Sequence, residues 1–158
     1  MDDLYAINVA KTEFREGYNR GDAARILAAA DPDLVNFSSE QPSGFGKNGL
    51  DDLAIRLQNL FEQFAVALAV IIVEIRIKAD LAYDYGWHEL TLTPKTGGPT
   101  IYRRDRYVDI WRKNPEGSWK LWMYMDNQDI PDPFQPGPVP SQQLTATNAR
   151  ESSCTAGR

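Results

Sequence analysis

Four long segments with the composition of β-strands fill most of the second half of the chain. They span residues 66–77, 82–93, 101–113 and 118–129, and each is rich in β-branched or aromatic residues. Short connections join them, so consecutive segments are expected to pair in an antiparallel sheet. Such a sheet buries one face against helices. The sequence therefore predicts an α+β fold with a pocket between the two layers.

Three helices are expected before the long strands. Apolar residues recur at helical spacing over residues 3–18, and an alanine-rich segment over 22–30 follows them. A third helix, over about residues 50–64, carries an apolar stripe along one side. A short strand at 33–38 and a loop at 39–48 are expected between the second and third helices.

One folded domain is expected, over residues 1–130. The 158 residues are 42% hydrophobic and 25% charged, a composition that suits a single globular core. Residues 131–158 are rich in proline and small polar residues. Such a segment buries too little apolar surface to order itself, so we expect a disordered tail.

Charge and hydropathy exclude several classes of partner. A formal net charge of -5 disfavours nucleic acid, and the apolar run 65–73 is shorter than the ~20 residues that a membrane helix needs.

The acidic start at Asp2 and Asp3 lacks the basic region of a secretory signal, so a cytoplasmic location is expected. The single cysteine, Cys154, excludes an internal disulfide and a multi-thiolate metal site. We expect neither a metal site nor a cofactor.

The order of these elements resembles the nuclear transport factor two-like superfamily, which includes SnoaL-like cyclases and ketosteroid isomerases. The resemblance covers about residues 3–130 and rests on short tracts that occur in the same order. The tracts are NRGD at 19–22, Gly49 at the start of the third helix, AYDYG at 82–86, YVDIWR at 107–112, GSWKL at 117–121 and NQD at 127–129.

This resemblance implies an α+β, cone-shaped, cystatin-like fold in which three N-terminal helices pack on a curved, mostly antiparallel sheet. It also implies a homodimer, and a pocket between the concave sheet and the helices. The fold alone does not fix a function, because this scaffold is reused for many.

The ketosteroid isomerase mechanism pairs an aspartate base with an oxyanion hole made by a tyrosine and a neutral aspartic acid. In this chain the tyrosine position falls on Phe14 and the base position on Phe37, so steroid isomerisation by that route is not expected. The third position falls on Asp109. In an apolar pocket, burial would raise the pKa of Asp109 and make it a proton donor. The alternative is a surface acid paired with an arginine.

Strand alternation groups the side chains of the last two strands into two faces. One face is aromatic and acidic, with Tyr107, Asp109, Trp111, Trp122, Tyr124 and Asp126. The other is aliphatic, with Val108, Ile110, Leu121, Met123 and Met125. Hydrophobicity alone would turn the aliphatic face inward. The resemblance instead implies that the aromatic and acidic face lines the pocket, leaving the aliphatic face for a dimer interface.

His88, the only histidine, shares its strand face with Asp84 and Gly86. It is the natural candidate for a general base at neutral pH, and the alternative is a structural histidine satisfied by a neighbour or by water. The tract GFGKNG at 44–49 matches the dinucleotide-binding pattern G-x-G-x-x-G. No strand ends directly before it and no strand–helix units follow, so a loop at the pocket rim is expected there.

Two functions therefore stay open. The first is a pocket for a small hydrophobic or aromatic ligand, which acts as an isomerase, cyclase or hydratase with Asp109 and His88 as its catalytic groups. Its ligand-binding residues would be Phe14, Tyr18, Phe37, Tyr107, Trp111, Trp122, Tyr124 and Asp126. The second is a non-catalytic homodimeric module for binding or assembly, whose cavity is filled by side chains.

Overall fold

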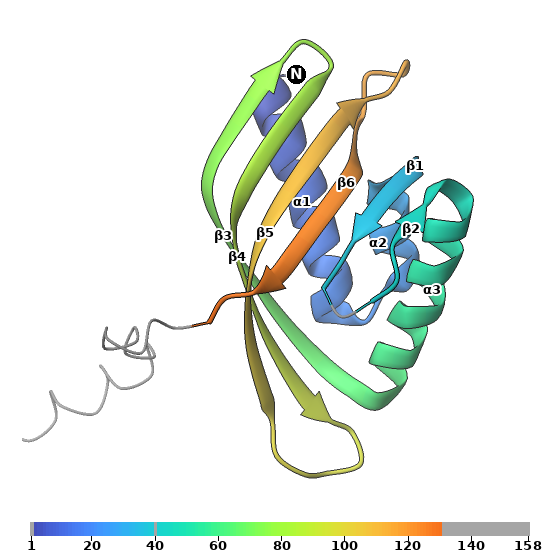
Figure 1. Cartoon of the computed structure of the whole chain (residues 1–158), viewed down its shortest axis with the longest axis vertical. Helices are drawn as coiled ribbons and strands as arrows, with labels where there is room; N and C mark the ends of the chain where they lie inside the picture. The colour runs from blue at the N-terminus through green and yellow to red at the C-terminus, as the bar shows by residue number, and fades with distance from the viewer. Residues whose placement is uncertain (1, 40, 131–158) are drawn as a thin grey trace, which may run out of the picture.

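The computed structural model describes residues 2–39 and 41–130, which form three helices and one six-stranded sheet (Figure 1). The helices are α1 (Asp3–Arg20), α2 (Ala23–Ala29) and α3 (Gly46–Gln63). The strands are β1 (Ala30–Phe37), β2 (Gly44–Phe45), β3 (Phe64–Lys78), β4 (Leu81–Pro94), β5 (Ile101–Lys113) and β6 (Trp119–Gln128). The predicted disordered tail, 131–158, lies outside the described residues.

The sheet is open and has the strand order β2-β1-β6-β5-β4-β3. Strands β3 to β6 pair antiparallel in sequence order, as predicted. Strand β1 joins them by parallel pairing with β6, and the two-residue β2 adds an antiparallel edge that is too short to leave a sequence pattern. Figure 1 shows α1 crossing behind the middle strands, while α2 and α3 lie toward the β1 and β2 edge.

Local capping signals set the ends of the helices. The Asp2 side chain caps α1 by accepting a hydrogen bond from the Leu4 N–H at 3.3 Å. Gly21 ends α1 in the left-handed conformation, with φ at 65°. Helix α3 begins at Gly46, earlier than predicted, because the glycines within 44–49 let the loop turn directly into the helix. Within the described residues, no helix is both long and apolar enough to cross a membrane.

A β-bulge in β6 changes which of its side chains face the helices. Trp111 pairs with Leu121 out of step with the preceding pairs, so Trp122 is the extra residue. Leu121 consequently turns into the core and is 3% exposed. The Trp122 ring lies 5.1 Å from the guanidinium of Arg112 instead. The sequence prediction assumed unbroken alternation, and the bulge corrects it for both residues.

Alternation along β1 corrects a second assignment. Leu34 and Asn36 take the buried positions, whereas Phe37 is half-buried on the other face. The Phe37 ring packs edge-to-face against Phe45, with the ring centroids 5.7 Å apart. Asn36, rather than Phe37, is therefore the side chain that β1 turns toward the helices.

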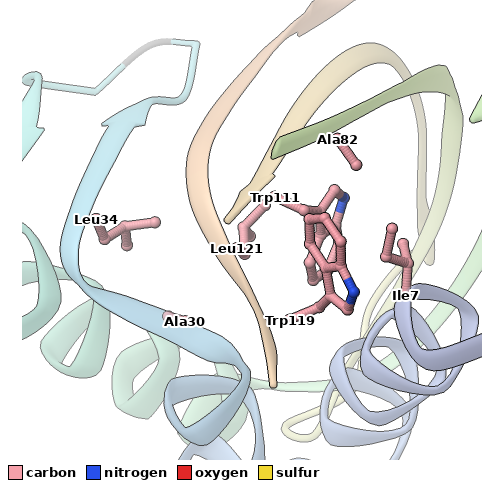
Figure 2. Close-up of a cluster of buried hydrophobic side chains, with 7 residues drawn as sticks. All are labelled: Ile7, Ala30, Leu34, Ala82, Trp111, Trp119 and Leu121. Carbon is pink, nitrogen blue, oxygen red and sulfur yellow. The ribbon is translucent and has the colours of Figure 1, made fainter. Parts of the chain in front are cut away.

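The main apolar cluster packs the N-terminal half of α1 against the sheet (Figure 2). Ile7 of α1 faces the rings of Trp111 and Trp119, and Leu121 closes the cluster from β6. Trp111 is 1% exposed, and large aromatic side chains of this kind contribute most to the energy of a core. The candidate site lies beside the C-terminal half of α1, where Phe14 and Tyr18 line a cavity.

Candidate functional site

A cavity of about 350 Å³ lies between α1, α3, β1 and β6. Its apolar lining consists of Phe14, Leu34, Leu53, Leu57, Leu60, Phe64 and Leu121. Its polar lining consists of Tyr18, Asn36, Ser38, Gln41, Arg56, Asn59, Gln63 and Tyr124. Gln41, Asn59 and Gln63 are exposed and mark the mouth. An apolar wall with a few placed polar groups is the usual composition of a small-molecule site.

A buried cluster of three charged residues lies at the interface between α1 and the sheet. The Lys11 Nζ is 2.7 Å from Oδ2 of Asp84 and 2.9 Å from Oδ2 of Asp109. The three side chains are between 0% and 8% exposed. Sequence reasoning missed Lys11, although a signal was present: Lys11 lies on the same apolar helix stripe as Ile7 and Phe14.

Asp84 has more hydrogen-bond donors than its neighbour. In addition to Lys11, it accepts hydrogen bonds from the Tyr107 hydroxyl and the Trp111 indole N–H, each at 2.7 Å. Asp84 and Asp109 are cross-strand partners on β4 and β5, which holds the two carboxyl groups together. The cluster therefore contains one cation and two carboxyl groups.

Asp109 is the carboxyl group that remains incompletely satisfied. Its Oδ2 accepts the hydrogen bond from Lys11, while its Oδ1 is buried and has no hydrogen-bond partner among the described residues. Burial raises the pKa of Asp109 to about 6, with the Lys11 charge opposing and the Asp84 charge reinforcing the increase. Asp109 can therefore hold or release a proton close to neutral pH.

His88 is buried in a stack of aromatic rings. Its ring lies 4.1 Å from that of Tyr107 at 9° and 6.1 Å from that of Tyr124 at 18°. Burial, and then the charge of Lys11, lower the pKa of His88 to about 3. This low pKa leaves the imidazole neutral at pH 7 and makes it a weak base.

Tyr124 links the charged cluster to the cavity. It lines the cavity, it is the cross-strand partner of Asp109, and its hydroxyl donates a hydrogen bond to Asp126. Asp126 also accepts hydrogen bonds from the Ser39 N–H at 2.7 Å and the Ser38 hydroxyl at 3.2 Å. Burial and then the Asp126 charge raise the pKa of the Tyr124 hydroxyl, so Tyr124 stays protonated and acts as a donor.

Most of the residues predicted for the site are brought together. Phe14, Tyr18 and Tyr124 line the cavity, whereas Phe37 and Trp122 are not among its lining residues. Tyr107, His88, Asp109, Trp111 and Asp126 form the buried layer next to it. Sequence reasoning missed Lys11, Asn36, Arg56 and the hydrogen-bonding role of Asp84.

Comparison with known proteins supports the fold. No family model matches the sequence, and no curated protein gives a significant match. The structure is similar to a ketosteroid isomerase-like protein from Erwinia carotovora atroseptica SCRI1043, with a TM-score of 0.71 and 26% identity over 82% of this chain and 98% of that one. It is also similar to a nuclear transport factor two-like protein with a cystatin-like fold from Novosphingobium aromaticivorans, with a TM-score of 0.67, 13% identity and coverage of 83% and 84%.

A third similar structure is the hexachlorocyclohexane dehydrochlorinase LinA-type3 from Novosphingobium barchaimii LL02, with a TM-score of 0.67 and 14% identity over 80% of this chain and 86% of that one. The TM-scores and coverages show that these structures share the overall fold of this chain. The chain has the fold of the nuclear transport factor two-like proteins.

Proposed function

We propose that this protein binds a small hydrophobic or aromatic molecule in the cavity and acts on it by acid–base chemistry, as an isomerase, cyclase or hydratase. The observation that carries the proposal is the buried carboxyl group of Asp109, whose Oδ1 has no hydrogen-bond partner among the described residues and whose strand partner Tyr124 lines the cavity. Two structural neighbours, the ketosteroid isomerase-like protein and the dehydrochlorinase, have names that denote reactions of small molecules.

Each polar group has a distinct part in this proposal. Tyr18 and Tyr124 hold the reacting end of the ligand by hydrogen bonds at the cavity wall. Asp109 supplies or takes up the proton, since its raised pKa makes both protonation states available near neutral pH. Lys11 positions the Asp109 carboxyl group through Oδ2 and leaves Oδ1 available. His88 contributes a neutral ring that stacks against Tyr124.

Filling the cavity tests the binding part of the proposal. We expect the wild-type protein to bind the probe 2-naphthol. Leu53→Trp adds an indole to the part of the lining that α3 supplies, so this variant should not bind the probe. The matched control is Ile55→Trp on the same helix, where the side chain is 59% exposed, and it should bind the probe normally. Fluorescence titration measures both, and equal binding by the two variants would contradict the proposed pocket.

Asp109→Asn tests the proton-holding role. The pKa of Asp109 is raised from 3.8 to about 6, so the folded protein retains a proton that the unfolded chain releases between these values. The protonated Asp109 contributes stability to the folded state. This contribution is fully present below about pH 3.8 and is lost as the pH rises through about 6. Asparagine does not titrate, so the variant does not lose this stabilisation. As the pH rises from about 4 to 7, its free energy of unfolding should therefore increase by about 3 kcal/mol relative to that of the wild-type protein.

Urea unfolding at a series of pH values measures this difference. A constant stability difference across the series would show that Asp109 has an ordinary pKa. The same variant should bind 2-naphthol but lose turnover of any substrate that the wild-type protein converts, and unchanged turnover would remove Asp109 from the mechanism.

The second candidate is a homodimeric binding or assembly module without turnover. The outer face of the sheet supports it: Tyr85, Val108 and Met125 form one cross-strand row and are 37%, 44% and 49% exposed. An exposed apolar face of this kind is typical of an interface between two copies. The same interface is compatible with the enzymatic proposal. The two candidate functions therefore make the same prediction for the outer sheet face and different predictions for ligand binding and turnover in the cavity.

Met125→Asp places a charge at the β6 end of this row, and we expect it to convert a dimer to monomers. Ile55→Asp is the control, because Ile55 is more exposed than Met125 but lies on α3 and not on the sheet. Native mass spectrometry distinguishes the two states. A wild-type protein that is monomeric at micromolar concentration, or a Met125→Asp variant that remains dimeric, would rule out this interface.

A further inference from the structure

Arg56 is the one charged side chain among the described residues that line the cavity. It lies half-buried on α3, one turn from Leu53 and Leu60, which belong to the apolar wall. Its guanidinium contacts the side-chain oxygen of Gln41, a neutral group at the mouth. Within the described part of the chain, no carboxylate lies within ion-pair distance of it.

Most other arginines of the described chain have such a partner. Arg25 pairs with Glu13, Arg104 with Glu89, and Arg112 with Asp31. A guanidinium presents a planar fork of donors that matches a carboxylate in a bidentate geometry. Gln41 occupies part of that fork, and among the described residues no counterion neutralises the Arg56 charge.

We propose that the cavity binds a small organic acid, whose carboxylate pairs with Arg56 while its apolar body lies against the leucines and aromatic rings of the wall. This inference rests on the proposed function, because it names the chemical class of the molecule that the cavity takes. None of the described residues that line the cavity is acidic, so none of them repels an anion. The ion pair lies near the mouth, and the body of the acid extends toward Tyr18 and Tyr124.

Two probes of the same shape test the charge requirement. 2-Naphthoate is ionised at about pH 8, and 2-naphthamide replaces its carboxylate with a neutral amide. We expect the wild-type protein to bind the acid at least about tenfold more tightly than the amide, as a hydrogen bond to a charged group predicts. Isothermal titration calorimetry measures both affinities, and shifts of the Leu53 and Leu60 methyl resonances show that the probe lies in the cavity.

Variants then assign the preference to Arg56. Arg56→Gln should remove the preference for the acid and leave the affinity for the amide unchanged, and Arg56→Lys should retain part of it. Lys47→Gln removes the same charge from an 83%-exposed position on α3 and should behave like the wild-type protein. If Arg56→Gln does not fold, the comparison of the two probes on the wild-type protein and on Arg56→Lys still decides the question.

The outcomes separate this inference from the proposed function. Equal affinity for acid and amide, or a preference that survives in Arg56→Gln, overturns the organic-acid inference and leaves the pocket intact. Failure of both probes to shift the cavity resonances overturns both proposals.

Discussion

Replacing Lys11 with methionine should lower the free energy of unfolding by about 3–5 kcal/mol at about pH 7.5. Methionine preserves the apolar stem of the side chain but removes the ammonium group that contacts Asp84 and Asp109. The two carboxyl groups then face each other in a dry interior without a cation, and such uncompensated charges are costly. Urea unfolding followed by circular dichroism measures the loss.

Two further variants show whether the loss comes from the buried charge. Lys47→Met removes a lysine from an exposed pair with Asp51 and should cost only about 0–1 kcal/mol. Combining Lys11→Met with Asp109→Asn removes one of the two repelling carboxylates and should recover part of the stability. A Lys11→Met variant that loses less than about 1 kcal/mol would show that water reaches the cluster.

The pH dependence of this loss follows from the same cluster. The Lys11 charge lowers the pKa of Asp109, so its removal raises that pKa further. The folded variant therefore takes up a proton at a higher pH than the wild-type protein does, and its stability relative to wild type should rise as the pH falls from about 8 to 5.

The sequence predicts the elements of this fold well because their periods are regular over many residues. The β5 strand occupies the predicted range, and its alternation correctly groups Tyr107, Asp109 and Trp111 on one face, which the structure buries. The helix periodicity likewise places Phe14 and Tyr18 against the sheet, where they line the cavity. The grouping of side chains on one face depends on local geometry alone, whereas the choice of the inward face of β5 came from the family resemblance.

Features that depend on pairing between distant segments are not predictable in the same way. The bulge at Trp122 arises from how β6 matches β5, and it reverses the expected positions of Trp122 and Leu121. Lys11 finds a partner 98 positions away in the sequence, so nothing near it indicates that its charge is neutralised. The chemistry of the candidate site depends on these long-range contacts, which explains why the fold was easier to predict than the site.

The largest effect of a single methyl group is expected at Gly86. Gly86 pairs with Ile72 beside the irregularity where the register of β3 shifts between Ile72 and Glu74. A Cβ atom at Gly86 would lie 1.9 Å from the Ile71 carbonyl oxygen and 2.9 Å from its carbonyl carbon. Both are backbone atoms, so no rotamer change relieves the collision, and β3 must move away from β4.

Gly86→Ala should therefore destabilise the fold by more than about 4 kcal/mol, beyond the range of ordinary substitutions. Because Gly86 shares its strand face with Asp84 and His88, separation of β3 from β4 also disturbs the buried layer behind the cavity. Gly97→Ala is the control: the added methyl meets nothing within 4 Å, and its φ of 87° costs about 1–2 kcal/mol. Thermal unfolding compares the two, and a Gly86→Ala variant that melts within a few degrees of wild type would mean that close contact between the β3 and β4 backbones is not required for the fold.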